Sequence, residues 1–173
     1  MARVGPLRRG VSEARVVKTG SDEYQGGRMT YTLEVSIARP RANVFELFEN
    51  PNHWLKWQDS LVRWEALEGT PGHSGARAKL THQFGRREIE MVETVESKHL
   101  PEEMTCIYTA PGAWNRVTHR FVEMGSHETR WIFDTEFRCT GVLRLMAFLR
   151  PGMFRNASLK DMTSFKTFAE SQE

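Results

Sequence analysis

The sequence is poor in the features that mark secreted, metal-stabilised or membrane-spanning proteins. Only two cysteines, Cys106 and Cys139, occur among its 173 residues, far apart and without a paired spacing. This disfavours a disulfide framework or a cysteine-based zinc site and suits a reducing compartment. No run approaches the roughly 20 apolar residues of a membrane-spanning helix, and no apolar segment of a secretory signal follows the basic start. We therefore expect a cytoplasmic protein without stable membrane insertion.

A large excess of charge of either sign is also missing, since the formal net charge is +2. Residues 1–28 carry six basic and three acidic side chains, so they contribute +3 and the remaining residues −1. A nucleic-acid-binding domain normally carries its basic excess on a folded face, so we expect no nucleic-acid partner. The glycine-rich, charged residues 1–28 predict a flexible basic leader, with an arm for acidic surfaces as the alternative. Residues 29–173 are then a single domain.

Sequence motifs for cofactor chemistry are missing as well. There is no serine-centred nucleophile elbow, phosphate-binding glycine loop or dinucleotide fingerprint. No cluster of histidine and acidic residues has the spacing of a metal site. We therefore expect neither a cofactor nor a metal.

The domain begins with a strand followed by two short helices. Over residues 29–37, apolar side chains alternate strictly with polar ones, which predicts a half-buried strand. Pro40 suits the start of a helix, where its missing N–H is harmless. Asn50-Pro51 ends that helix because a residue preceding proline avoids the helical conformation. A second short helical turn is expected up to Trp57.

Six further strands are expected without an intervening helix. They cover approximately 61–68, 75–84, 87–97, 103–110, 113–124 and 128–139. Short turns rich in glycine and proline separate them, so consecutive strands should pair as an antiparallel meander. Each strand has one apolar and one polar face, as in a sheet covered on one side only.

The cover for this sheet is expected from the last segment, residues 141–173. Apolar residues recur there at helical intervals, beginning with Leu143, Met146 and Leu149. Pro151-Gly152 interrupts the run and predicts a kink, or a first helix that ends near Arg150. The sequence thus predicts an α+β fold in which a curved seven-stranded antiparallel sheet wraps around a long C-terminal helix.

This order of elements resembles the START-like superfamily, also called SRPBCC or helix-grip, which includes polyketide cyclase/dehydrase-like and lipid-transfer domains. The local matches are Ile37-Ala38-Arg39-Pro40 running into Val44-Phe45-Glu46-Leu47-Phe48, then Asn50-Pro51, Trp57, Val95-Glu96, His119-Arg120-Phe121, Thr129-Arg130 and Phe165-Lys166. The resemblance covers about residues 29–170. It implies an elongated apolar cavity between the sheet and the C-terminal helix.

Several polar residues fall on the predicted inward faces, namely His82, Glu93, Tyr108, His119 and Thr135. Burying such groups without a partner costs roughly 1–3 kcal/mol each. They should therefore pair with each other, lie at a solvent-exposed entrance to the cavity, or bind a ligand. Glu93 is the most informative because desolvation would raise its pKa. A β-bulge that turns Glu93 outward, or a salt bridge at the rim, is the alternative.

The function expected from this arrangement is binding, or transport, of a small hydrophobic molecule such as a lipid, isoprenoid or polyketide-like compound. The candidate lining residues are Met91, Tyr108, Phe121, Phe133, Met146, Leu149 and Met153. One alternative is a cyclase or dehydratase that uses His82, Glu93 and His119 as acid, base and carbonyl-polarising groups. Another is a ligand-free domain that acts through its surface, in protein contacts or as a homodimer.

Overall fold

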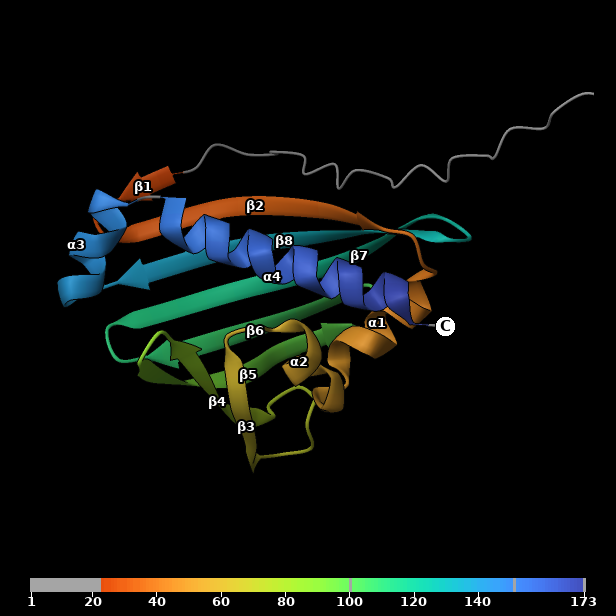
Figure 1. The fold of residues 1–173 in the computed structure, drawn as a ribbon, viewed down its shortest axis with the longest axis horizontal. Helices are drawn as coiled ribbons and strands as arrows, with labels where there is room; N and C mark the ends of the chain where they lie inside the picture. Colours follow the sequence, from red (N-terminus) through yellow and green to blue (C-terminus); the bar gives the residue numbers. More distant parts are fainter. Residues whose placement is uncertain (1–22, 100, 151, 173) are drawn as a thin grey trace, which may run out of the picture.

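The computed structural model describes residues 23–99, 101–150 and 152–172. Within these ranges one antiparallel sheet curves around a long helix near the C-terminus (Figure 1). The strands are β1 (Glu23–Gln25), β2 (Arg28–Ile37), β3 (Leu61–Glu68), β4 (Arg77–Phe84), β5 (Arg87–His99), β6 (Glu103–Ala110), β7 (Ala113–Gly125) and β8 (Glu128–Cys139). The helices are α1 (Arg41–Glu49), α2 (Pro51–Trp57), α3 (Gly141–Leu149) and α4 (Gly152–Ser171). The helix-grip architecture is thus confirmed.

The sheet order is β1-β2-β8-β7-β6-β5-β4-β3. Every strand from β3 to β8 pairs with its neighbour in sequence, as the short turns predict, and β2 closes against β8 over its full length. The inward face carries the expected apolar residues, among them Leu33, Val95, Cys106 and Val117, each at most 2% exposed.

The sheet has eight strands rather than the expected seven. The additional strand, β1, lies inside the predicted leader and pairs with the start of β2 through a turn at Gly26-Gly27. Both glycines have positive φ angles of 59° and 98°, which glycine adopts at little cost and which match the twist of a two-residue hairpin. The rest of the expected leader, residues 1–22, lies outside the described residues.

The two short helices follow β2 as expected. The side chain of Asn50 accepts a hydrogen bond from the Asn52 N–H, and Pro51 occupies the first turn of α2. Phe48 of α1 and Trp57 of α2 stack with their ring centroids 5.8 Å apart. Together α1 and α2 close one end of the space between the sheet and α4 (Figure 1).

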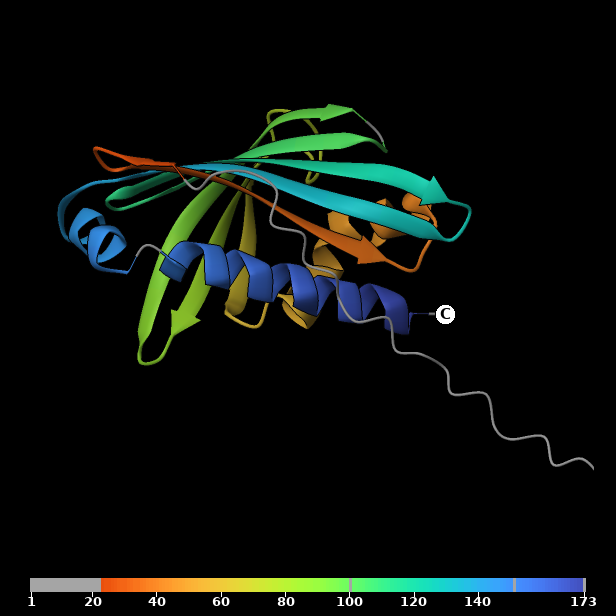
Figure 2. The same ribbon diagram turned by 90° about the horizontal axis from the view of Figure 1, so that it is seen from above.

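The C-terminal segment forms two helices, with α3 ending next to the predicted break. Helix α4 crosses the inward face of the sheet, as Figure 2 shows from above. It buries Met162, Phe165 and Ala169, each at most 1% exposed. In α3, by contrast, only Ala147 is buried. Helix α3 therefore packs at the end of the sheet and does not continue the inward stripe of α4.

The end of the core beneath α1 and α2 is filled by aromatic rings. Phe48 lies at its centre, with ring centroids 4.8–5.8 Å from those of its neighbours Trp57, His119, Phe121, Trp131 and Phe165. Such edge-to-face and offset contacts add to the apolar burial. Within the described part of the chain, no helix is long and apolar enough to cross a membrane.

Candidate functional site

A row of polar side chains crosses the inward face of the sheet at mid-height. Glu93 on β5 is directly opposite Tyr108 on β6, and Tyr108 is opposite Asn115 on β7. Glu93 is only 7% exposed, so no bulge turns it outward. The row therefore begins with a carboxyl group on an otherwise apolar surface, at the position that the alternation predicts.

The Tyr108 side chain lies close enough to the carboxyl of Glu93 and the thiol of Cys106 for hydrogen bonding among these groups to influence their pKa values. Burial raises the pKa of Glu93 to about 7, and the hydrogen bond from Tyr108 acts in the opposite direction. Burial also raises the pKa of Cys106 and of Tyr108 well above their ordinary values, with the Glu93 charge as the next cause in both. Cys106 is therefore a neutral thiol, whereas Glu93 changes charge near neutral pH.

The polar row continues to the other side of the sheet. The Asn115 amide donates to the Thr135 hydroxyl (2.6 Å) and to the Glu136 carbonyl (3.1 Å). Tyr31, which is opposite Thr135, shares a hydrogen bond of 3.0 Å with Ser158 of α4. Sequence reasoning missed Asn115 and Ser158, although Asn115 has the same strand parity as the inward residues Val117 and His119. The row thus spans five strands, β5, β6, β7, β8 and β2, and reaches the covering helix.

His119 lies apart from this row, inside the aromatic end of the core. Trp131 Nε1 donates to His119 Nδ1 over 3.3 Å, and Nε2 is buried without a partner among the described residues. Burial lowers the pKa of His119 to about 3. The ring is therefore neutral at physiological pH, with its proton on Nε2 because Nδ1 accepts.

His82 lies on the inward face of β4 and is 7% exposed. Its Nδ1 is 2.9 Å from the hydroxyl of Ser60, at the start of β3. Burial lowers its pKa. The ring stacks on Phe84 with a centroid distance of 6.2 Å.

The structure does not bring His82, Glu93 and His119 together. Glu93 is opposite Ala78, four residues from His82 along β4, which amounts to about 13 Å along the strand. His119 is opposite Met104, four residues from Tyr108 along β6 and in the opposite direction. Each of the three polar groups has its own local partner: Ser60, Tyr108 or Trp131.

The residues expected to line a cavity fall into three environments. Phe121 and Phe133 are buried in the packed aromatic end. Met91 and Tyr108 are partly buried beside Glu93, and Met153 is partly buried at the start of α4. Met146 and Leu149 lie on α3 and are 40% and 67% exposed. For these two, the expected inward orientation is wrong, because α3 turns away from the sheet.

The inward face is less enclosed beyond the polar row, on the side of the β4–β5 hairpin. Ile89 is opposite His82 and therefore points to the same face, yet it is 38% exposed. Phe84, two residues beyond His82 on the same face, is 51% exposed. On β8, by contrast, the face is covered at the level of the polar row, since Phe137, which is opposite Asn115, packs on Phe154 of α4 at a centroid distance of 5.0 Å. Accessible apolar surface therefore lies on the inward side of β4 and β5.

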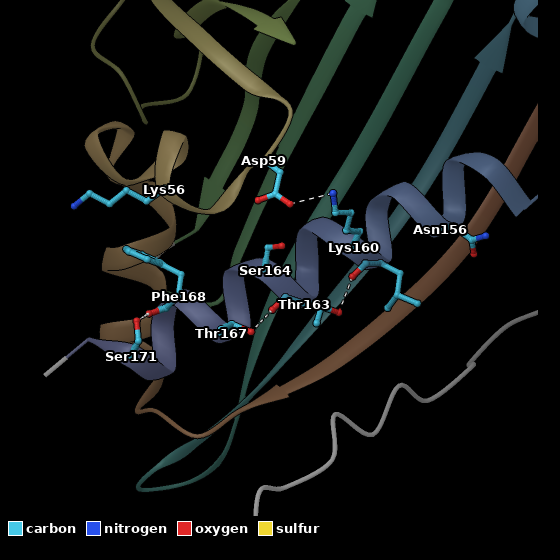
Figure 3. Close-up of a pocket in the computed structure, with 10 residues that line it drawn as sticks. Lys56, Asp59, Asn156, Lys160, Thr163, Ser164, Thr167, Phe168 and Ser171 are labelled. Carbon is cyan, nitrogen blue, oxygen red and sulfur yellow. Dashed lines mark hydrogen bonds and ion pairs between the residues drawn. The ribbon is translucent and has the colours of Figure 1, made fainter. Parts of the chain in front are cut away.

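A separate surface groove of about 700 Å³ lies along α4, on the side of α2 (Figure 3). It is lined by Lys56, Asp59, Asn156, Leu159, Lys160, Thr163, Ser164, Thr167, Phe168 and Ser171. Lys160 of α4 reaches across to Asp59, with an N–O distance of 3.0 Å. Both side chains are more than half exposed, and hydroxyl groups dominate the remaining lining. The groove is thus open to solvent and combines apolar surface from Leu159 and Phe168 with hydroxyl and charged groups.

Among residues 23–99, 101–150 and 152–172, no group of three or more histidine, cysteine and acidic side chains is placed to hold a metal ion. Both cysteines are buried and free. The arrangement therefore offers apolar surface, hydroxyl and carboxyl groups for binding or proton transfer.

Comparison with known proteins agrees with this architecture. The model of the family described as "Polyketide cyclase / dehydrase and lipid transport" matches residues 28–169. No curated protein matches the sequence significantly.

Similar solved structures share the fold at low sequence identity. The Zhui aromatase/cyclase from Streptomyces sp. R1128 aligns with a TM-score of 0.68 at 15% identity, over 83% of this chain and 94% of its own. A conserved protein from Geobacillus kaustophilus aligns with a TM-score of 0.70 at 11% identity, over 81% of this chain and 94% of its own. Ara h 8.0201 aligns with a TM-score of 0.65 at 13% identity, over 84% of this chain and 100% of its own.

Proposed function

We propose that this chain, which belongs to the polyketide cyclase/dehydrase and lipid transport family, binds or transports a small hydrophobic molecule between the sheet and α4. The candidate ligand classes are lipids, isoprenoids and polyketide-like compounds. Free, buried cysteines fit the expected reducing, cytoplasmic setting.

The observation that supports this proposal is the unequal filling of the inward face. One end is closed by the rings around Phe48, whereas Phe84 and Ile89 at the other end keep 51% and 38% of their surface in contact with solvent. Covering such apolar surface contributes about 25 cal/mol per Å². A ligand seated there gains affinity from surfaces that the folded chain itself leaves uncovered.

The polar row at mid-height would set the orientation of this ligand. Glu93 and Tyr108 border the accessible apolar surface, and Met91 lies next to them. A hydroxyl or carbonyl group on an otherwise apolar molecule would find a donor and an acceptor there. Methionine adapts its shape to different partners, so Met91 suits a family of related ligands.

Native mass spectrometry of the freshly purified protein, with organic extraction of bound material, tests the proposal. We expect an apolar compound to co-purify with the wild-type chain. Met91→Trp should reduce its occupancy severalfold, because the larger ring would occupy the proposed ligand site beside Glu93.

The matched control is Val122→Trp, which adds a similar ring to the outer face of β7, where Val122 is 41% exposed. This variant should retain the compound at the wild-type level. Equal occupancy in both variants would place the ligand elsewhere and refute the proposal.

A second candidate function is a cyclase or dehydratase activity at the same place. It is favoured by Glu93, which lies opposite Tyr108, since a carboxyl group with a pKa of about 7 can both donate and accept a proton at neutral pH. His82 and His119 lie too far along the strands to join this pair. Glu93→Gln separates the two candidates, because it would abolish turnover of a polyketide-like substrate while leaving its binding within a few fold.

A further inference from the structure

Helix α3 presents an apolar stripe to the solvent. Val142, Leu145, Met146 and Leu149 follow the i, i+3, i+4, i+7 spacing of one helix face, and Phe148 lies beside them. Their exposed fractions are 74%, 58%, 40%, 67% and 67% for Val142, Leu145, Met146, Leu149 and Phe148. Contiguous exposed apolar patches on soluble domains mark interaction sites. The stripe has the spacing of a buried helix face, yet its side chains remain largely exposed.

The stripe is flanked in the sequence by basic residues. Between Glu136 and Asp161 the sequence contains no acidic residue and five basic ones, namely Arg138, Arg144, Arg150, Arg155 and Lys160. Arg144 lies in α3, and Arg150 follows it directly. Both are exposed, and neither forms an ion pair with a carboxylate of the described residues. Apolar side chains flanked by unpaired arginines are typical of helices that lie in the plane of an anionic membrane surface.

An aromatic side chain from the neighbouring hairpin extends this surface. Tyr24 of β1 lies against Phe148, with their ring centroids 6.5 Å apart, and its hydroxyl donates to the Arg144 carbonyl over 3.4 Å. A cleft of about 420 Å³ separates the β1–β2 turn from α3. Tyrosine is favoured at the depth of lipid headgroups because its ring is apolar and its hydroxyl polar.

We propose that α3 docks the protein onto an anionic lipid surface, with Phe148, Leu145 and Leu149 entering the headgroup region and Arg144 and Arg150 contacting the lipid phosphates. Hydrophobic burial of the stripe and attraction of the arginines act together in such docking. Each arginine near the surface strengthens binding by about 1 kcal/mol, or roughly fivefold.

The charge of the α3 surface favours an anionic lipid surface as its partner over a second copy of the chain or residues 1–22. A second copy of the chain in a two-fold dimer would bring the same arginines from both copies to one interface. Residues 1–22 carry five basic and two acidic side chains, so they do not complement the charge of α3 either. An anionic membrane surface complements both the apolar stripe and the arginines.

The position of α3 connects this docking surface with the proposed ligand site. Both Figure 1 and Figure 2 show α3 and the tip of the β4–β5 hairpin at the same end of the molecule. Docking would therefore bring the accessible apolar surface at Phe84 and Ile89 close to the membrane. This connection rests on the proposed ligand binding, whereas the docking itself does not.

Flotation of the full chain with lipid vesicles tests the proposal. We expect binding to vesicles that contain phosphatidylglycerol, weaker binding to pure phosphatidylcholine vesicles, and a decrease as the salt concentration rises. Phe148→Ser combined with Leu149→Ser should weaken binding at least about tenfold, because it removes two apolar side chains from the stripe. Arg150→Gln should weaken it about fivefold.

The matched control combines Leu55→Ser with Leu67→Ser, two apolar residues that are 50% and 46% exposed on α2 and β3. This variant should bind vesicles like the wild type. Light scattering after gel filtration should show a monomer for wild type and for the α3 variant.

Two results would overturn the proposal. Unchanged vesicle binding by the α3 variant would assign any binding to another part of the chain, such as residues 1–22. A wild-type dimer that the α3 variant converts to a monomer would identify the occupant as a second copy. Because neither result depends on the contents of the inward face, failure here and failure of ligand binding are distinguishable.

Discussion

At the scale of single residues, Glu93 dominates the electrostatics of the inward face. Its carboxyl group is buried, and no cation contributes to its pKa of about 7. In the unfolded chain the same group titrates near 4.5. The folded protein therefore binds one proton more than the unfolded chain between these two pH values.

This difference makes stability depend on pH in a defined direction. Because the folded pKa is raised, the contribution of Glu93 is most favourable below pH 4.5 and is lost as the pH rises towards 7. The full loss is about 3 kcal/mol. We expect Glu93→Gln to remove this pH dependence. The free energy of unfolding of the variant should therefore increase relative to that of the wild type as the pH rises from 4.5 to 8.

Urea unfolding of both proteins over this pH range measures the effect. The difference between them must be used, since the lowered pKa values of His82 and His119 change stability in the opposite direction as the pH falls. A difference that stays constant with pH would show that Glu93 is ionised, or accessible to water, in the folded protein.

At the scale of secondary-structure elements, α4 is held by its buried aromatic residue. Phe165 is fully buried and packs on Phe48, Trp57 and Trp131 at centroid distances of 5.1–5.5 Å. Phe165→Ala should lower the free energy of unfolding by about 3–5 kcal/mol, because it leaves a cavity at the centre of this cluster. Thr167→Ala, at an exposed position two residues along the same helix, should change it by less than about 1 kcal/mol.

The same denaturation experiment decides this prediction. Equal and small effects of the two substitutions would mean that α4 does not pack on the aromatic end of the core.

The periodicity of the sequence was sufficient to predict the sheet and the side that α4 covers. Alternation in β5 correctly placed Glu93 on the buried face, and the turn residues predicted the order of the strands. It could not predict β1, because three residues show no period and the strand depends on the geometry of Gly26-Gly27. The short turns set the topology, whereas tertiary contacts decide whether such a small element forms.

Periodicity could not predict the orientation of α3. Helical spacing shows that Met146 and Leu149 share a face, but not whether that face meets the sheet or the solvent. The partners within the site were equally hidden, since hydrogen bonds such as those from Asn115 to Thr135 depend on register between strands. Strand parity would have placed Asn115 among the inward residues, and this was the signal that the sequence reasoning did not use.

At the scale of the whole molecule, the account rests on a division of the inward face. The end under α1 and α2 is packed with aromatic rings, and the end near the β4–β5 hairpin keeps apolar surface accessible. The polar row from Glu93 to Ser158 runs between them. The exposed stripe of α3 forms a third apolar surface, outside this space.

The methionines lie in different regions of the molecule, so each can serve as a probe of its own region. Met91 is partly buried next to Glu93, Met153 is partly buried at the start of α4, Met162 is 1% exposed in the packed core, and Met146 is 40% exposed on α3. Their methyl signals in NMR spectra of the methyl-labelled protein can be followed while anilinonaphthalene sulfonate, an apolar fluorescent probe, is added. The account predicts that the signals of Met91 and Met153 shift together with the rise in fluorescence, while that of Met162 stays in place. Probe binding that leaves Met91 and Met153 unchanged would contradict it.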